Sequence, residues 1–431
     1  MRFGRWLGSL DHQETQTLEQ PASSTPLALA VQPLRVGVVG ATLSGLATAW
    51  ELEQAGHHVI VFDHALSVGD RYRPAEITRP DGRRQRVPTA TGVQADDDGT
   101  FARWTSNFGV DLEPITGTLV DADDQAISPT KPLRELQTLE VRARRHRRST
   151  RAAHHWFSLW RLDECYEWLC LELARAGRAD LAYPELPTFL VFRAARSLGL
   201  IPASLSEPKL VHVRAGLDEL CRQIARELGD VRLGQRVRSV NRAGARIALV
   251  ADGVHQLDCL VVACKPVSAL KFLDANPVEL RNFDLVRSLR KLNTIYTIEG
   301  PTNRPTRVTR VGLDLTESVT SSRYDEFGVV RFETHFETVT ELVDARARIT
   351  REAERILGPN ARVSAEEIGC APSYVDSGDF RKSTLDEFVA LQGSRNTYYT
   401  ELPLGNDFPK ERLGIASWLR RRLRVRRLTN E

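Results

Sequence analysis

The chain has 431 residues, of which 42% are hydrophobic and 27% are charged, with a formal net charge of +3. This composition excludes a largely disordered chain, and the length favours two domains over one. No apolar run approaches the roughly 18 residues of a membrane-spanning helix. The six cysteines form no C-x-x-C pair, and most of them lie in apolar patterns. We therefore expect no metal site and no disulfide scaffold, and we predict a reducing, cytoplasmic compartment.

Residues 11–33 are polar with interspersed proline and serine, and we predict that residues 1–33 form a flexible leader. Residues 34–63 then form a complete βαβ pattern. An apolar strand at 34–39 is followed by a tight turn at 40–45, a helix at 46–54 and a second strand at 58–62. Gly56 stands where a helix C-cap belongs, and Asp63 ends the second strand.

The turn of this unit is a candidate nucleotide site, because it directs backbone N–H groups and a helix N-terminus at a diphosphate. Its candidate residues are Gly40, Ala41, Thr42, Ser44 and Gly45. Asp63 is placed to accept hydrogen bonds from a ribose. An ordinary βαβ crossover has the same strand and helix, so a purely structural role stays open as the alternative.

Further elements follow along the chain. Helices are predicted at residues 101–108, 156–174, 216–229 and 338–357, and strands at 231–233, 237–241, 247–250, 259–263, 293–299 and 329–334. The helix at 156–174 carries an apolar stripe that includes Leu159, Tyr166 and Leu173, and we expect it to pack over a sheet. The strands at 293–299 and 329–334 alternate as half-buried strands do.

Six arginines lie between Arg142 and Arg151. They form either a solvated helix face or a weak contact site for an anionic ligand or a membrane surface. No aromatic residues are interleaved with them and no nucleic-acid-binding motif surrounds them, so we expect no nucleic-acid partner.

Four blocks of the chain, taken in order, carry a family resemblance. They are the βαβ unit at 40–63, the segment Val68-Gly69-Asp70-Arg71, the stretch from Arg214 to Leu220 with Val237 and residues 258–266, and the segment 391–399 with the terminal helix after it. This order resembles the flavin-dependent amine oxidase superfamily. That group includes monoamine oxidases, protoporphyrinogen oxidases, phytoene desaturases and a polyenoic fatty acid isomerase, and the last block is most similar to the isomerase branch.

The resemblance implies an α/β fold, in which a glutathione-reductase-like FAD-binding Rossmann domain carries an inserted substrate domain of mixed sheet and helices. The FAD-binding domain would comprise residues 34–90, 206–266 and 370–424, and the substrate domain residues 91–205 and 267–369. Four more cofactor-binding residues are implied: Gly69, Arg71, Val237 and Glu401. Val237 would lie on the adenine side, and Glu401 would bring a carboxylate toward the flavin ring.

The chain departs from the family pattern where the cofactor is contacted. Thr42 replaces the middle glycine of the turn, and Asp70 replaces the second glycine of a doublet. The implied function is an FAD-dependent oxidoreductase or flavin-dependent isomerase that acts on an apolar or amine-bearing small molecule by hydride transfer to flavin. The alternative is a flavin-free relative that serves as a binding or interaction protein. No catalytic residue is identified from the sequence. This does not exclude an enzyme, since members of this superfamily often work with little acid–base help.

Overall fold

The computed structural model describes residues 33–78, 82–90, 92, 94–95, 99–114, 134–139, 141–142, 150–176, 178, 181, 185–201, 210–297, 319–324, 328–359, 361–380, 382–403 and 408–428. The predicted leader, apart from its last residue, and the central arginines of the basic run lie outside these residues. None of the helices in the described part of the chain is long and apolar enough to cross a membrane.

The part of the chain that contains the βαβ unit is built on a five-stranded sheet in which all paired strands are parallel. Its order is β17 (Thr397–Tyr399), β12 (Cys259–Val262), β1 (Arg35–Val39), β2 (His58–Phe62) and β8 (Val231–Arg232). Strands from three distant stretches of sequence are thus neighbours in one sheet. The fold is α/β with a Rossmann-like arrangement, as predicted, and the carboxyl ends of β1, β2 and β12 lie along the same edge.

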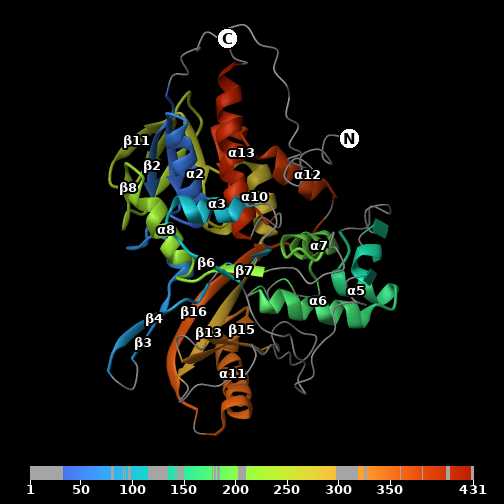
Figure 1. Cartoon of the computed structure of the whole chain (residues 1–431). Helices are drawn as coiled ribbons and strands as arrows, with labels where there is room; N and C mark the ends of the chain where they lie inside the picture. The colour runs from blue at the N-terminus through green and yellow to red at the C-terminus, as the bar shows by residue number, and fades with distance from the viewer. Residues whose placement is uncertain are drawn as a thin grey trace, which may run out of the picture.

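Both faces of this sheet are covered (Figure 1). One face packs against α2 (Leu43–Gln54), α3 (Thr100–Asn107), α8 (Leu217–Arg226) and α13 (Pro409–Leu428). The other face packs against β9 (Ser239–Asn241), β10 (Ile247–Val250), β11 (Val254–Leu257), α9 (Pro266–Ala269), α10 (Pro277–Asp284) and α12 (Lys382–Ala390). Burial on both faces explains why the central strands are apolar runs without alternation.

A second, antiparallel sheet lies below the first in Figure 1. Its order is β14 (Val319–Tyr324), β15 (Val329–Phe336), β13 (Arg287–Thr297) and β16 (Val363–Tyr374). The prediction that residues 329–334 are half-buried is wrong, because β15 is buried along its whole length. Phe332 and Phe336 pack against α11 (Leu342–Leu357) on one face, and a hairpin of β3 (Ala75–Thr78) and β4 (Arg84–Val87) covers Val329 on the other.

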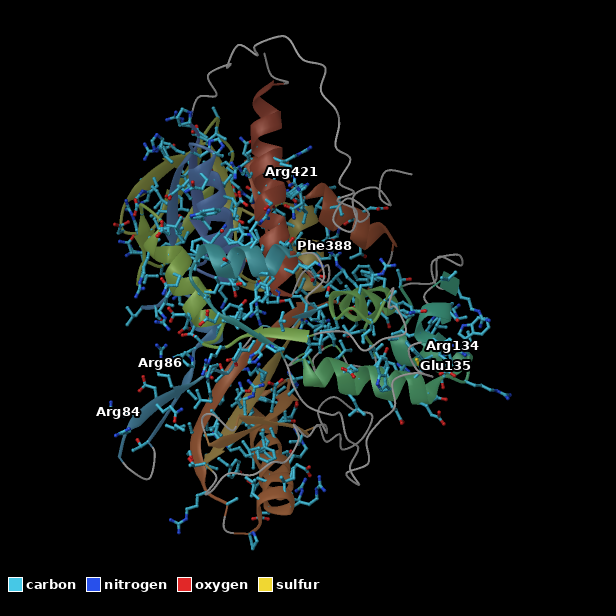
Figure 2. The ribbon with its side chains drawn as sticks, viewed as in Figure 1. Arg84, Arg86, Arg134, Glu135, Phe388 and Arg421 are labelled. Carbon is cyan, nitrogen blue, oxygen red and sulfur yellow. The ribbon has the colours of Figure 1, made fainter. Side chains whose placement is uncertain are left out.

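Short elements complete the described structure. They are η1 (Asp70–Tyr72), β5 (Gln94–Ala95), β6 (Leu112–Pro114), α5 (Ala153–Leu159), α6 (Asp163–Arg175), α7 (Thr188–Ser197), β7 (Leu210–Val213), η5 (Val339–Glu341) and η6 (Ser394–Asn396). Figure 2 shows Arg84 and Arg86 projecting from the hairpin. Arg86 donates to Asp218 of α8 at 3.0 Å, which ties the hairpin to the part built on the parallel sheet.

The predicted single helix at 156–174 is wrong, because the structure divides it into α5 and α6. Arg161 adopts a left-handed conformation (φ 55°), and the Leu162 N–H donates to the carbonyl of Phe157, which closes α5. The acidic residue Asp163 then begins α6, where the helix dipole favours negative charge. As a result Leu159 is 52% exposed and is not part of the buried stripe.

A buried ionic cluster around Arg242 fixes the position of β17. The side chain of Arg242 is fully buried and donates to both oxygens of Glu279, at 2.8 Å each. The hydroxyl of Tyr399 on β17 donates to the same carboxylate at 2.6 Å. Burial raises the pKa of Glu279, but the hydrogen bonds from Arg242, Tyr399 and the backbone of Asn276 lower it further, so the net direction is down.

This shift predicts a stability change with pH. A carboxyl whose folded-state pKa lies below its unfolded value, about 4.3, stabilises the fold above that value. The stabilisation from Glu279 is therefore complete at neutral pH and is lost as the pH falls through the lower folded-state pKa. We expect the melting-temperature difference between wild type and Glu279→Gln to be largest at neutral pH and to shrink on acidification. A difference that grows in acid would contradict this account.

Candidate functional site

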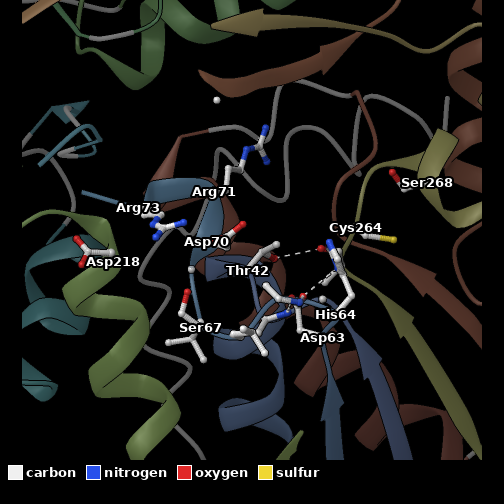
Figure 3. Close-up of a pocket in the computed structure, with 18 of the residues that line it drawn as sticks. Thr42, Asp63, His64, Ser67, Asp70, Arg71, Arg73, Asp218, Cys264 and Ser268 are labelled. Carbon is white, nitrogen blue, oxygen red and sulfur yellow. Dashed lines mark hydrogen bonds and ion pairs between the residues drawn. The ribbon is translucent and has the colours of Figure 1, made fainter. Parts of the chain in front are cut away.

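A cavity of about 1880 Å³ opens at the carboxyl edge of the parallel sheet and extends to β16 (Figure 3). This volume exceeds the roughly 300–1,000 Å³ of an ordinary small-molecule pocket. Eight of the ten predicted cofactor-binding residues line it: Gly40, Ala41, Thr42, Asp63, Gly69, Arg71, Val237 and Glu401. The other two, Ser44 and Gly45, lie behind this lining in α2. The structure thus brings all ten to one region.

The two glycines of the turn are required by close packing. Gly40 has φ +119°, and a Cβ there would lie 2.5 Å from the carbonyl oxygen of Ala263. A Cβ at Gly45 would lie 2.1 Å from the carbonyl oxygen of Gly40. Both positions therefore exclude a side chain, and α2 begins directly against the turn with its N-terminus toward the cavity.

Thr42 fits the turn without strain. Its backbone is extended (φ −82°, ψ 169°), a conformation that any residue adopts, and it is the N-cap of α2. Its hydroxyl accepts a hydrogen bond from the Gly45 N–H and donates to the carbonyl of Ala263, at 3.2 Å each. The threonine in place of glycine is therefore used as a helix cap.

Asp63 joins the end of β2 to the turn. Its Oδ2 accepts the Ala41 N–H at 2.6 Å, and its Oδ1 accepts the Ala65 N–H at 2.8 Å. A carboxylate has about four lone-pair sites, so acceptor capacity remains for the hydroxyls of a ribose. The side chain of His64 is 79% exposed and lies 3.2 Å from Asp63 Oδ1.

Glu401 lies in a buried cluster with two arginines. Its Oε2 accepts from Arg71 Nη1 at 2.8 Å, and its Oε1 accepts from Ser44 Oγ at 2.7 Å and from Arg412. Side-chain exposures of 4% for Glu401, 14% for Arg71 and 2% for Arg412 show that the cluster is largely dry. Burial raises the pKa of Glu401, but Arg412, Arg71 and Ser44 lower it further, so the net direction is down.

The ionised cluster of one carboxylate and two guanidinium groups carries a net positive charge. The position of Glu401 in the sequence suggests that it brings an uncompensated carboxylate toward a cofactor. In the structure the carboxylate is compensated, because Arg71 and Arg412 more than neutralise its charge. Sequence reasoning missed Arg412, which is one of many arginines in the terminal helix and follows no motif. Only the folded chain pairs it with Glu401.

Arg71 presents an unfilled donor. Its Nη2 is buried and has no hydrogen-bond partner among the residues that the structure describes. Arg71 and the N-terminus of α2 both border the cavity, so a guanidinium and a positive helix end converge there. Leaving a buried charged donor unpaired is costly, and an anionic group such as a diphosphate would satisfy it. The residues present therefore fit a dinucleotide.

The other departure from the family pattern, Asp70 after Gly69, places no uncompensated charge inside the cavity. Gly69 donates its N–H to the carbonyl of Ala41 at 2.9 Å and packs against Cys221, where a Cβ would lie 2.9 Å from that of the cysteine. Asp70 begins η1 and its side chain is exposed, so water screens its carboxylate from the cavity. Figure 3 shows Asp70 between Thr42 and Arg71, with Cys264 on the opposite side.

The cysteine that lines this cavity, Cys264, is not activated as a nucleophile. Burial raises the pKa of the Cys264 thiol to about 12, and the carboxylates of Glu401 and Asp63 act in the same direction. The thiol is therefore neutral and unreactive at physiological pH. Among the described residues no cluster of His, Cys, Asp and Glu is arranged to hold a metal ion.

Comparison with known proteins finds the same fold in other proteins. Residues 38–95 match the model of an NAD(P)-binding Rossmann-like domain. A CLA-producing fatty acid isomerase from P. acnes is 15% identical, with a TM-score of 0.71 over 90% of this chain and 98% of that chain. Comparison with curated protein sequences finds no match.

Two amine oxidases are also similar in structure. Putrescine oxidase, in a complex with putrescine, is 16% identical with a TM-score of 0.70, over 91% of this chain and 99% of that one. Cyclohexylamine oxidase from Brevibacterium oxydans IH-35A is 12% identical with a TM-score of 0.67, over 91% and 98%. The part built on the parallel sheet has a Rossmann-like fold, the fold of the NAD(P)-binding domain model that residues 38–95 match. More narrowly, the chain shares its overall fold with these two amine oxidases and the isomerase, as the order of sequence blocks suggested.

The Glu401 cluster predicts a large stability effect. Glu401→Gln leaves Arg71 and Arg412 buried without their counter-charge, and breaking a buried pair costs about 3–5 kcal/mol. Denaturant unfolding of the protein freed of any cofactor measures the change. Asp230→Asn is the matched control, since the Asp230 carboxylate is 37% exposed where it pairs with Arg232, and it should cost less than about 1 kcal/mol. Equal losses in the two variants would contradict a structural role for the cluster.

Proposed function

We propose that this chain is an FAD-dependent oxidoreductase or flavin-dependent isomerase that acts on an apolar or amine-bearing small molecule. The observation that carries the proposal is the unpaired Nη2 of Arg71 in a cavity that runs from the dinucleotide turn to β16. The similarity of the fold to amine oxidases and a fatty acid isomerase supports it. When bound, the flavin would supply the hydride acceptor that the described side chains lack.

In this proposal the chain itself binds and positions the cofactor. Arg71 and the first turn of α2 hold the diphosphate, Asp63 accepts from the adenosine ribose, and Val237 borders the adenine. Glu401 and Arg412 act through Arg71, because they fix its guanidinium at the cavity wall. We further propose that the FAD-binding domain comprises residues 34–90, 206–266 and 370–424, and the substrate domain residues 91–205 and 267–369.

The cavity is long enough to hold a dinucleotide cofactor and a substrate at the same time. Its nucleotide end is formed by Gly40 and Asp63, and its far end by Ala365 and Gly369 of β16. A substrate bound against β16 would therefore lie beyond the reactive end of an extended dinucleotide. This placement, rather than a catalytic acid or base, is what the chain would contribute to hydride transfer.

Visible absorption of the purified protein tests the proposal, and Asp63→Ala tests the orientation of the cofactor. Bound flavin gives a yellow protein. Loss of the charge-assisted hydrogen bond to the ribose costs about 1.5–3 kcal/mol, so FAD affinity should fall roughly tenfold to a hundredfold. Asp70→Ala is the matched control: an exposed carboxylate at the same cavity should change affinity by less than about threefold.

A colourless protein that also fails to take up added FAD would contradict the proposal. It would favour the flavin-free relative that acts as a binding or interaction protein. A yellow protein with unchanged affinity in Asp63→Ala would remove Asp63 from the site but leave the cofactor in place.

A further inference from the structure

The second half of α13 concentrates positive charge. Six of the eight residues from Arg420 to Arg427 are arginines, and no acidic residue occurs at positions 412–428. The formal net charge of the whole chain is +3. One short segment therefore carries more positive charge than the balance of the entire molecule. We call residues 420–427 the basic helix end.

The part of α13 that precedes most of these arginines is anchored on α2. Leu419 and Leu423 are buried in the core that the two helices share. Ser417 Oγ and Arg420 Nη1 both donate to the carboxylate of Glu51 on α2, at 2.8 Å each. These contacts hold α13 in place as far as Leu423, and so they fix where the basic helix end lies on the molecule.

The basic helix end points away from the cavity. The start of α13 contacts the first turn of α2 through the Glu401 cluster, whereas Arg420 contacts Glu51 near the end of α2. The two helices therefore run in the same direction, from the carboxyl edge of the sheet toward its opposite edge. Figure 1 shows that α13 extends beyond α2. Five helical residues after Leu423 correspond to about 7 Å of projection.

The described part of the chain supplies little counter-charge here. Arg420 pairs with Glu51. Arg421 and Arg422 are exposed, and neither forms an ion pair with a residue that the structure describes. The dipole of a helix offers only about half a negative charge at its C-terminus, which is far less than six arginines require. Neutralisation of this segment is therefore left to solvent ions or to an anionic partner.

A lipid surface suits this geometry better than a nucleic acid does. A tip that projects by about 7 Å can meet a plane, but it is shorter than the roughly 8.5 Å depth of the major groove of DNA. No aromatic residue that could stack on bases occurs at positions 419–428. After Leu423 the residues of α13 other than arginine are Val425 and Leu428. Apolar residues among arginines are typical of helices at a bilayer interface.

We propose that the basic helix end docks the protein on an anionic phospholipid surface. Clusters of four to eight basic residues on a helix bind anionic lipids, and each residue near the surface strengthens binding about fivefold. This surface lies apart from the cavity, so docking leaves the carboxyl edge of the sheet free. The inference goes beyond the proposed function and does not depend on a bound flavin.

Co-sedimentation of the full chain with vesicles tests the proposal. One set of vesicles is phosphatidylcholine alone, and the other is an equal mixture of phosphatidylcholine and phosphatidylglycerol. We expect binding to the mixed vesicles and not to the neutral ones. Raising the salt from about 0.1 M to about 1 M shortens the screening length from about 10 Å to about 3 Å, so binding should then be lost. Equal binding to the two sets, or binding to neither, would overturn the proposal.

A pair of double variants locates the effect. Arg421→Gln with Arg422→Gln removes two exposed charges but keeps good helix formers, and affinity for the mixed vesicles should fall roughly twenty- to thirtyfold. The matched control is Arg351→Gln with Arg362→Gln. It makes the same charge change at exposed residues of α11 and of the segment before β16, at the other end of the molecule (Figure 1). Equal losses in the two double variants would show an effect of net charge alone and would overturn the assignment.

Titration with a mixed-sequence DNA duplex in the same low-salt buffer separates a lipid surface from a nucleic acid. Weaker binding to the duplex than to the mixed vesicles supports the proposal. Tighter binding to the duplex that is lost in Arg421→Gln with Arg422→Gln would overturn it in favour of a nucleic-acid partner. Circular dichroism of every variant verifies that the fold is retained.

Discussion

The burial of the Glu401 carboxylate between Arg71 and Arg412 is the constraint on which the site depends. It joins four parts of the chain, since Ser44 of α2, Arg71 of η1, Glu401 after β17 and Arg412 of α13 meet at one carboxylate. Desolvating three charges is expensive, and a buried ion pair is weak evidence for stability. Its consequence is geometric: the guanidinium of Arg71 is held with Nη1 bonded to Glu401, while Nη2 is buried without a hydrogen-bond partner among the described residues.

Two buried clusters flank the same short strand. At the last residue of β17, Arg242 and Glu279 hold Tyr399. Two residues further along the chain, Arg71 and Arg412 hold Glu401. The intervening residue Thr400 donates its N–H to the carbonyl of Val262 at 3.0 Å, which continues the parallel sheet. The carboxyl end of β17 is thereby fixed from both sides, as a preorganised binding site requires.

Much of the nucleotide-binding half could be predicted from local sequence. The strand at 58–62 and the helix that follows Thr42 are set by periodicity, by Gly40 and by Gly45, all of which act over a few residues. Other features depend on tertiary contacts. Arg412 becomes a partner of Glu401 only in the fold, the break between α5 and α6 depends on a left-handed Arg161, and the burial of β15 depends on α11 and the β3–β4 hairpin. The domain boundaries and the binding roles of the site residues stay predictions.

Titration of the cofactor-free protein with FAD, for wild type and Arg71→Met, tests the central claim most directly. Arg412 and Ser44 still neutralise and hydrogen-bond Glu401 in this variant, so the fold should persist, and circular dichroism verifies it. The account predicts that wild type binds FAD and that Arg71→Met loses about 1.5–3 kcal/mol of the binding free energy. Equal FAD affinity in the two proteins would show that Arg71 does not bind the diphosphate, and would contradict the account.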